Sequence, residues 1–303
     1  MKRILITSLA LSALLLPACK GGASADAVKL VPDGADFIVG AHPKVIAKSE
    51  LYKKFAPEFE NEADFKDAMA AFTSCDLKPL EFDAVIVGAN QTGDGVVIVA
   101  GNSVGKPDKA TCVIKAVQKQ SGETEAAEVV KEDGKSVINF TDGRAYLVND
   151  NMLAVATTAW QEDVSTLIDG KGKPASENSK KDLLGKVDTK KAAWFVGTVP
   201  TDLAGMAAMA GPEVTEVKSI AGSIDLSKGL ALALVAGFTD DAKATAAAEK
   251  VQGLFDGFKG MIPPETKGIA DTVKIEASGT DVKIGASASI ADLEAAKTVA
   301  AQL

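Results

Sequence analysis

The chain has 303 residues, of which 47% are hydrophobic and 24% are charged, and its formal net charge is -8. These proportions are typical of a globular protein with enough apolar residues to build one or two hydrophobic cores. An acidic body repels phosphate backbones, so the charge argues against a nucleic-acid-binding protein.

The N-terminus has the pattern of a secretory signal peptide. Lys2 and Arg3 form a short basic region, and residues 4–16 are almost entirely apolar. A helix needs about 20 apolar residues to cross the hydrocarbon core of a bilayer, and this run is shorter. We therefore predict that residues 1–18 form a leader that is removed from the mature protein.

The end of this leader, Leu16-Pro17-Ala18-Cys19, resembles the lipobox of bacterial lipoproteins. In that motif a large apolar residue lies three positions before the cysteine and a small residue directly precedes it. The resemblance implies cleavage before Cys19, acylation of its thiol and of its new amino group, and attachment to a membrane through lipid. Pro17 departs from the small or β-branched residue that is usual at its position. The alternative is an ordinary signal peptide followed by an unmodified cysteine.

The residue after Cys19 bears on the choice of membrane. In the lipoprotein family an aspartate at this position retains the protein in the inner membrane, whereas this chain has Lys20. The resemblance thus implies a lipid anchor in the outer membrane of the cell envelope, with the body facing the periplasm. Residues 19–30 begin with small and polar residues, and we expect them to form a flexible tether.

The predicted elements of the first half alternate between strands and helices. In chain order they are a strand at residues 35–40, a helix from Pro43 to Phe59, a helix at residues 65–72, strands at residues 83–90 and 95–101, and a helix from Pro107. Residues 127–157 then alternate short β-rich runs with turns such as Asp133-Gly134, which predicts an antiparallel meander. A short helix after Trp160 precedes a segment rich in glycine, lysine and serine.

Acylation of Cys19 would leave Cys75 and Cys112 as an even pair in an oxidising compartment. Cys112 lies opposite the apolar stripe of the helix that begins at Pro107. Because an unpaired structural cysteine is usually buried, this position favours a disulfide to an element on the outer side of the helix. The alternative is two unpaired thiols.

The second half repeats the order of the first. Residues 37–43 (FIVGAHP) align with residues 194–200 (WFVGTVP), with an aromatic residue, a glycine and a proline at equivalent positions. We therefore predict an α+β protein of two tandem repeats, each an antiparallel sheet with helices packed on one face. A merger of the two sheets into one is the alternative. The predicted parts are a first lobe at residues 31–170, a linker and short helix at residues 171–190, and a second lobe at residues 191–303.

Few residues have the chemistry of a catalytic or metal site, and we predict neither a metal nor a cofactor. His42 is the single histidine, so histidine-based metal sites and catalytic triads lack a second member. The acids of residues 58–67 fit no EF-hand spacing and predict a charged helical surface. Gly253, Gly257 and Gly260 recur along one helix, where they either admit a second backbone or an acyl chain or mark a fraying helix end.

The body of the chain is similar to uncharacterised predicted lipoproteins of myxobacteria and their relatives. The similarity rests on Val31-Pro32-Asp33-Gly34-Ala35, on the helix with Leu51-Tyr52, and on the passage from Val187-Asp188 to Trp194-Phe195. This family brings no known activity.

Three classes of function remain, in order of preference. We expect a non-catalytic, lipid-anchored envelope lipoprotein that binds or scaffolds an envelope protein or a lipid. The alternative is a carrier or chaperone for lipids or lipoproteins, with an apolar cavity between sheet and helices. An enzyme ranks third, because the sequence offers one histidine, no free thiol if the disulfide forms, and no recognisable acid/base pair.

Overall fold

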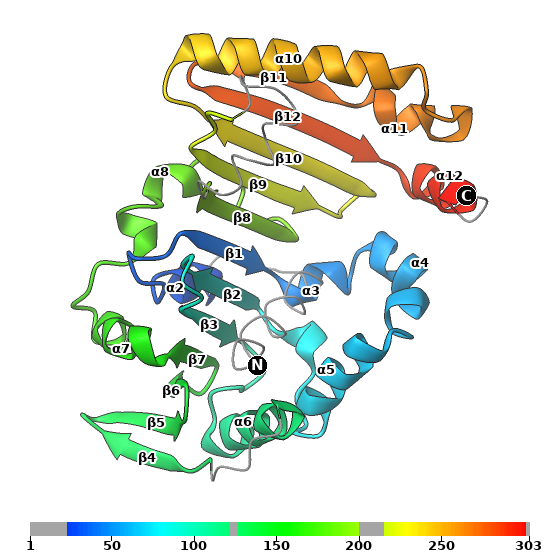
Figure 1. Cartoon of the computed structure of the whole chain (residues 1–303). Helices are drawn as coiled ribbons and strands as arrows, with labels where there is room; N and C mark the ends of the chain where they lie inside the picture. Colours follow the sequence, from blue (N-terminus) through cyan, green and yellow to red (C-terminus); the bar gives the residue numbers. More distant parts are fainter. Residues whose placement is uncertain (1–22, 122–126, 200–214, 301–303) are drawn as a thin grey trace. The chain divides into compact units, whose positions relative to one another are not determined.

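The computed structural model describes residues 23–121, 127–199 and 215–300. The predicted leader, Leu16 and Cys19 lie outside these ranges. The described chain combines helices with antiparallel strands, so the predicted α+β class is confirmed at this level (Figure 1).

The chain divides into two compact units. The first unit comprises the chain up to residue 48 with residues 52–182 and 189–193, and the second comprises residues 49–51, 183–188 and 194–303.

Seven described strands form an antiparallel sheet in the first unit. They are β1 (Phe37–Ala41), β2 (Ala84–Ala89), β3 (Gly95–Ala100), β4 (Val129–Glu132), β5 (Lys135–Phe140), β6 (Gly143–Asn149) and β7 (Met152–Thr157). Their order in the sheet is β1-β2-β3-β7-β6-β5-β4, and every neighbouring pair is antiparallel. The run β4 to β7 is the predicted meander. Its first turn is Asp133-Gly134, where both residues have positive φ, as a tight hairpin turn requires.

Short helices surround these strands. Up to residue 190 they are α2 (Ala23–Val28), α3 (Pro43–Ile46), α4 (Glu50–Phe59), α5 (Ala63–Thr73), α6 (Pro107–Ser121), α7 (Gln161–Ile168) and α8 (Lys181–Leu184), with 3₁₀ turns η1 (Pro79–Glu81), η2 (Thr158–Trp160) and η3 (Ala175–Glu177). The single helix predicted from Pro43 to Phe59 is wrong, because the chain leaves the helical path after Ile46 and begins α4 only at Glu50. Ser49 directly precedes α4, and serine is a residue type favoured at a helix start.

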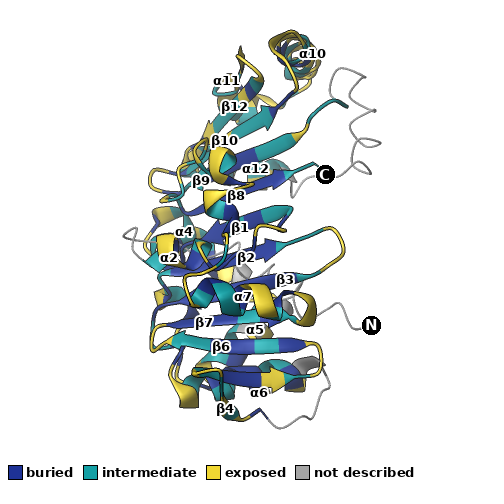
Figure 2. Ribbon diagram, turned by 90° about the vertical axis from the view of Figure 1, so that its left-hand side faces the viewer, coloured by how far each residue is buried: buried dark blue, intermediate teal, exposed yellow. Residues whose placement is uncertain are grey.

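Both faces of the first sheet are covered, which differs from the predicted one-sided packing. Nearly every residue of β2 and β3 is buried, as Figure 2 shows by the dark colour of both strands. Side chains alternate between the faces of a strand, so burial of consecutive residues requires a layer on each side. Val85 and Val87 pack into the cluster that contains the α6 residues Val113 and Ile114. On the opposite face, Gly88 lies against Val31, which follows α2.

Part of the expected tether is folded, so the prediction of a flexible segment at residues 19–30 is wrong from residue 23 onward. Residues 23–28 form α2, which contacts β2 and β3. Ser24 and Ala27 of α2 are buried, and so are Leu30 and Val31 just after the helix. The small and polar residues at the start of this stretch obscured these buried positions.

The second unit places strands beside one long helix. Its elements are β8 (Ala193–Thr198), β9 (Ser219–Asp225), β10 (Leu230–Gly237), α10 (Asp241–Lys259), η7 (Pro264–Thr266), α11 (Lys267–Asp271), β11 (Lys274–Ser278), β12 (Asp281–Ala288) and α12 (Ile290–Ala300). The strand order is β11-β12-β10-β9-β8. Asp240 caps α10 by accepting a hydrogen bond from the Lys243 backbone N–H. The alanine face of α10 packs with Phe238 and Val282.

A tight glycine contact joins the segment before α6 to the β6–β7 turn, and it leads to the first stability prediction. A Cβ atom on Gly105 would lie 1.9 Å from the Asn149 carbonyl oxygen and 2.6 Å from that of Met152. Backbone atoms cannot rotate away, so we expect Gly105→Ala to lower the free energy of unfolding by about 1–3 kcal/mol. Urea denaturation measures this change. Gly34→Ala is the matched control, because nothing lies within 4 Å of its Cβ position. Equal stability of the two variants would contradict the contact.

Candidate functional site

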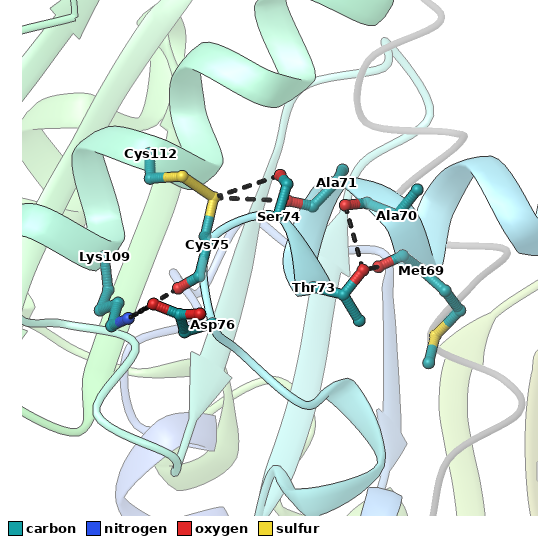
Figure 3. The surroundings of a disulfide bond; sticks show 9 residues. All are labelled: Met69, Ala70, Ala71, Thr73, Ser74, Cys75, Asp76, Lys109 and Cys112. Carbon is teal, nitrogen blue, oxygen red and sulfur yellow. Dashed lines mark hydrogen bonds and ion pairs between the residues drawn. A yellow bond between two sulfur atoms is a disulfide. The ribbon is translucent and has the colours of Figure 1, made fainter.

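A disulfide joins Cys75 to Cys112, so the predicted pairing of these residues is present in the structure (Figure 3). It links the turn that ends α5 to the second turn of α6. Cys75 is 4% exposed, whereas Cys112 is half-buried and lies at the side of its helix. The bond therefore fastens the turn after α5 to α6. Both cysteines pack with the cluster that contains Val113 and Ile114, so the predicted partner on the outer side of the helix is not what the structure shows.

A second contact holds the same turn. The Lys109 Nζ donates to the Cys75 carbonyl oxygen at 2.8 Å and lies 3.1 Å from the Asp76 carboxylate (Figure 3). The Asp76 side chain is almost fully exposed, so this ion pair contributes little to stability. The hydrogen bond from Lys109 to the Cys75 carbonyl oxygen holds the turn against α6 in addition to the disulfide.

An apolar pocket lies between α5, α6 and the sheet of the first unit. Its lining residues are Phe72, Val97, Val99, Val104, Val113, Ile114, Val117, Gln118, Phe140, Leu153 and Val155. Gln118 is the one polar residue of this lining, and it is 3% exposed. Phe72 comes from α5, one turn before Cys75, and its ring packs edge-on against Phe82 with centroids 5.7 Å apart.

The volume of the pocket limits what it holds in this state. It is about 30 Å³, whereas ligand pockets usually measure about 300–1,000 Å³. The pocket therefore has room for solvent-sized molecules only. An apolar cavity between sheet and helices was expected from the sequence only under the alternative of a carrier. Its position could not be predicted, because the lining comes from helices and strands far apart in the chain.

His42 occupies a structural position at the end of β1. The imidazole is buried, with Nε2 at 2.5 Å from the Thr189 carbonyl oxygen and Nδ1 at 3.3 Å from that of Asp83. The backbone N–H of His42 also donates to the Ala192 carbonyl oxygen. Both ring nitrogens thus face backbone acceptors. The ring thereby connects the end of β1 with the segments that contain Asp83 and Thr189.

A buried lysine sits where two distant segments of the first unit meet. The Ser179 backbone N–H donates to the Asp33 carboxylate at 2.9 Å, and its hydroxyl donates to the Asp33 carbonyl oxygen. The Ala175 backbone N–H donates to the Val31 carbonyl oxygen. Lys180 follows at 5% exposure. We call residues 31–36 and 174–180 the clasp. The sequence gives no sign of this lysine's burial, because its partners lie almost half the chain away.

The charge of Lys180 makes the stability of the clasp depend on pH. Burial lowers the pKa of its ammonium group, and the carboxylates of Asp36 and Asp33 oppose that shift. In the unfolded chain Lys180 keeps its proton up to about pH 10.5, whereas in the folded chain it loses the proton at a lower pH. Between these two pH values the unfolded state binds more protons, so the free energy of unfolding rises with pH. We expect this rise in the wild type and not in Lys180→Met, as measured by urea denaturation between pH 7 and pH 10.5.

The matched control for this experiment is Lys181→Met, since the neighbouring side chain is exposed. The control should follow the wild type. Parallel pH profiles for all three proteins would show that the Lys180 proton is not linked to folding.

Other candidates from the sequence remain dispersed. Among the residues that the structure describes, no group of three or more His, Cys, Asp or Glu side chains could hold a metal ion. Likewise, none of the described helices is both long and apolar enough to cross a membrane. Gly253, Gly257 and Gly260 face open space, with no described atom within 4 Å of a Cβ position. The neighbouring apolar side chains of Phe258 and Met261 are exposed.

Comparison with known proteins gives a distant structural likeness. No family model matches the sequence, and no curated protein matches it. Among solved structures, the chain is similar to crystal form I of TP0453, with 10% identity and a TM-score of 0.49 over 89% of this chain and 95% of that chain. Crystal form IV of TP0453 gives 10% identity and the same TM-score of 0.49 over 92% of this chain and 99% of that chain. This overlap is too low to establish a shared fold.

Proposed function

We propose that the protein is a non-catalytic, lipid-anchored lipoprotein of the cell envelope that binds or scaffolds another envelope component. The observation that carries this proposal is the structural use of the reactive side chains in the described residues. Cys75 and Cys112 pair with each other, both ring nitrogens of His42 face backbone carbonyl oxygens, and Lys180 is enclosed in the clasp. Each group serves the fold, which leaves binding as the simplest role.

The proposed location rests on the sequence. The lipobox at Leu16 to Cys19 supports a lipid anchor, and Lys20 in place of aspartate supports the outer membrane. The disulfide is in keeping with an oxidising compartment such as the periplasm. The helix α2 starts at residue 23, four positions after Cys19, so it would stand close to the anchored cysteine.

The strand order within each unit supports our proposal of a tandem duplication. In the first unit β1, β2 and β3 are followed in the sheet by β7 and β6, and in the second β8, β9 and β10 are followed by β12 and β11. α6 and α10 occupy the same place in the chain order, after β3 and β10. The hairpin β11–β12 thus corresponds to β6–β7. The pair β4 and β5 would be an addition at the sheet edge.

A carrier of apolar molecules is the second candidate, and the pocket beneath α6 favours it. The lining is apolar apart from Gln118, and part of it comes from half-buried side chains such as Phe72 and Val117. Its small volume ranks this role below the first. A carrier would have to widen the pocket before it could take up a ligand.

Crosslinking in intact cells tests the binding role. Cells that produce the wild-type protein are treated with a lysine-reactive crosslinker, and adducts are compared with those of Cys19→Ser, which lacks the acylation site. We expect a discrete adduct with one envelope component that depends on Cys19. A wild-type protein that forms no specific adduct, or the same adducts as Cys19→Ser, would contradict an anchored binding role.

A further inference from the structure

The pocket is bounded by a helix that is weakly attached to the rest of the first unit. Most α5 residues whose burial is described are exposed or half-buried, and among these Ala71 alone is buried. Near its C-terminal end the attachments are the Phe72 ring on Phe82, the disulfide at Cys75, and Lys109 on the turn that follows. The disulfide is the single covalent link between α5 and α6 in the described chain.

We propose that the Cys75–Cys112 disulfide holds the apolar pocket narrow, and that its reduction by a dithiol lets α5 move away so that the pocket admits a single unbranched apolar chain. This inference rests on the carrier role. Phe72 is the lining residue that α5 supplies, so movement of this helix withdraws an aromatic ring from the pocket. The remaining lining is aliphatic apart from Phe140 and Gln118, which suits an acyl chain and offers no charged group to a headgroup.

The chemical step follows thiol–disulfide exchange. Cys112 is the more exposed residue of the pair, so a thiolate of the dithiol attacks its Sγ and the S–S bond breaks. The electron pair passes to the Cys75 Sγ, which takes up a proton. The second thiol of the reagent then attacks the mixed disulfide and releases Cys112 as a thiol, so the reagent leaves as a disulfide. The Cys75 Sγ lies 3.3 Å from the Ala71 carbonyl oxygen, which can accept a hydrogen bond from the new thiol.

The opening is local because a second contact remains. Reduction leaves the hydrogen bond from the Lys109 Nζ to the Cys75 carbonyl oxygen at 2.8 Å (Figure 3). The turn at Cys75 and Asp76 therefore stays on α6 and acts as a pivot. The strands beneath the pocket are buried on both faces, so they keep their packing while α5 moves.

Binding of a dansyl-labelled undecanoic acid to the full mature protein, with and without dithiothreitol, tests the proposal. We expect about tenfold tighter binding after reduction, because the open form is a minor population in the oxidised protein. The double variant Cys75→Ala/Cys112→Ala should bind like the reduced wild type without dithiothreitol. Val117→Phe, which fills the pocket from α6, should remove the gain.

The other outcomes distinguish the control of the pocket by the disulfide from the carrier role. Equal, tight binding in both redox states that Val117→Phe abolishes would overturn the control of the pocket by the disulfide and keep the carrier role. No binding in either state would overturn both. Hydrogen exchange of the reduced protein supplies the structural readout. We expect the protection of β2 and β3 to fall only with the global stability, and that of α5 to fall well beyond it. Protection in α5 that falls no further than the global stability would show that the disulfide simply maintains the fold.

Discussion

Removal of the disulfide is expected to lower the free energy of unfolding of the first unit by roughly 3–4 kcal/mol. The bond closes a loop over a sequence separation of 37 residues, and the free energy of unfolding falls without it mainly because the unfolded chain gains conformational freedom. Cys75→Ala/Cys112→Ala is the appropriate variant, since a single substitution would leave one thiol free to react. Reduced wild type should lose stability by a similar amount.

The two tryptophans allow this effect to be assigned to one unit. Trp160 lies in the first unit and Trp194 in the second. Urea denaturation followed by fluorescence in a Trp194→Phe background reports the first unit, and in a Trp160→Phe background it reports the second. The cysteine substitutions should shift the first transition and leave the second in place. An equal shift of both transitions, or a change below about 1 kcal/mol in the first, would contradict this account of the disulfide.

The disulfide was predictable from the sequence because of the number of cysteines. Cys75 and Cys112 are the pair that remains once Cys19 is assigned to the lipid. The strands and the meander were likewise predictable, because aromatic and β-branched runs between turn residues are local signals. The covered second face of the sheet was not, since burial of β2 and β3 on both sides depends on α2 and Val31.

The clasp and the pocket depend on contacts between distant parts of the chain. Lysine is rarely buried, and residue 180 lies within the linker and short helix predicted at residues 171–190. Its burial follows from hydrogen bonds between Ser179 and Asp33, at a sequence separation of 146 residues. The pocket similarly requires Phe72 and Val117 to meet strands β3 and β7. Neither the periodicity of apolar residues nor a local motif indicates contacts between residues so far apart in the sequence.

Cys19→Ser is expected to have the largest effect on the protein in the cell, namely the loss of its attachment to the membrane. Each buried CH₂ group of an acyl chain adds about 0.8 kcal/mol to membrane binding, and two chains already give stable anchoring. No described helix could replace this anchor by crossing the bilayer. The variant should therefore move entirely from the membrane fraction to the soluble periplasmic fraction.

Lys20→Asp is the matched control for this substitution. It changes the adjacent residue, keeps the acylated cysteine, and should remain in a membrane fraction, with the inner membrane favoured by the rule of the lipoprotein family. Loss of the Lys20→Asp protein from all membrane fractions would show that the whole segment, rather than the Cys19 thiol, determines attachment.

Metabolic labelling with radioactive palmitate tests the lipid anchor most directly. The wild-type protein and Lys20→Asp should both carry the label, and Cys19→Ser should carry none while reaching the periplasm as a folded protein with its Cys75–Cys112 disulfide. A wild-type protein without label, or equal label on Cys19→Ser, would contradict the lipid-anchored envelope role.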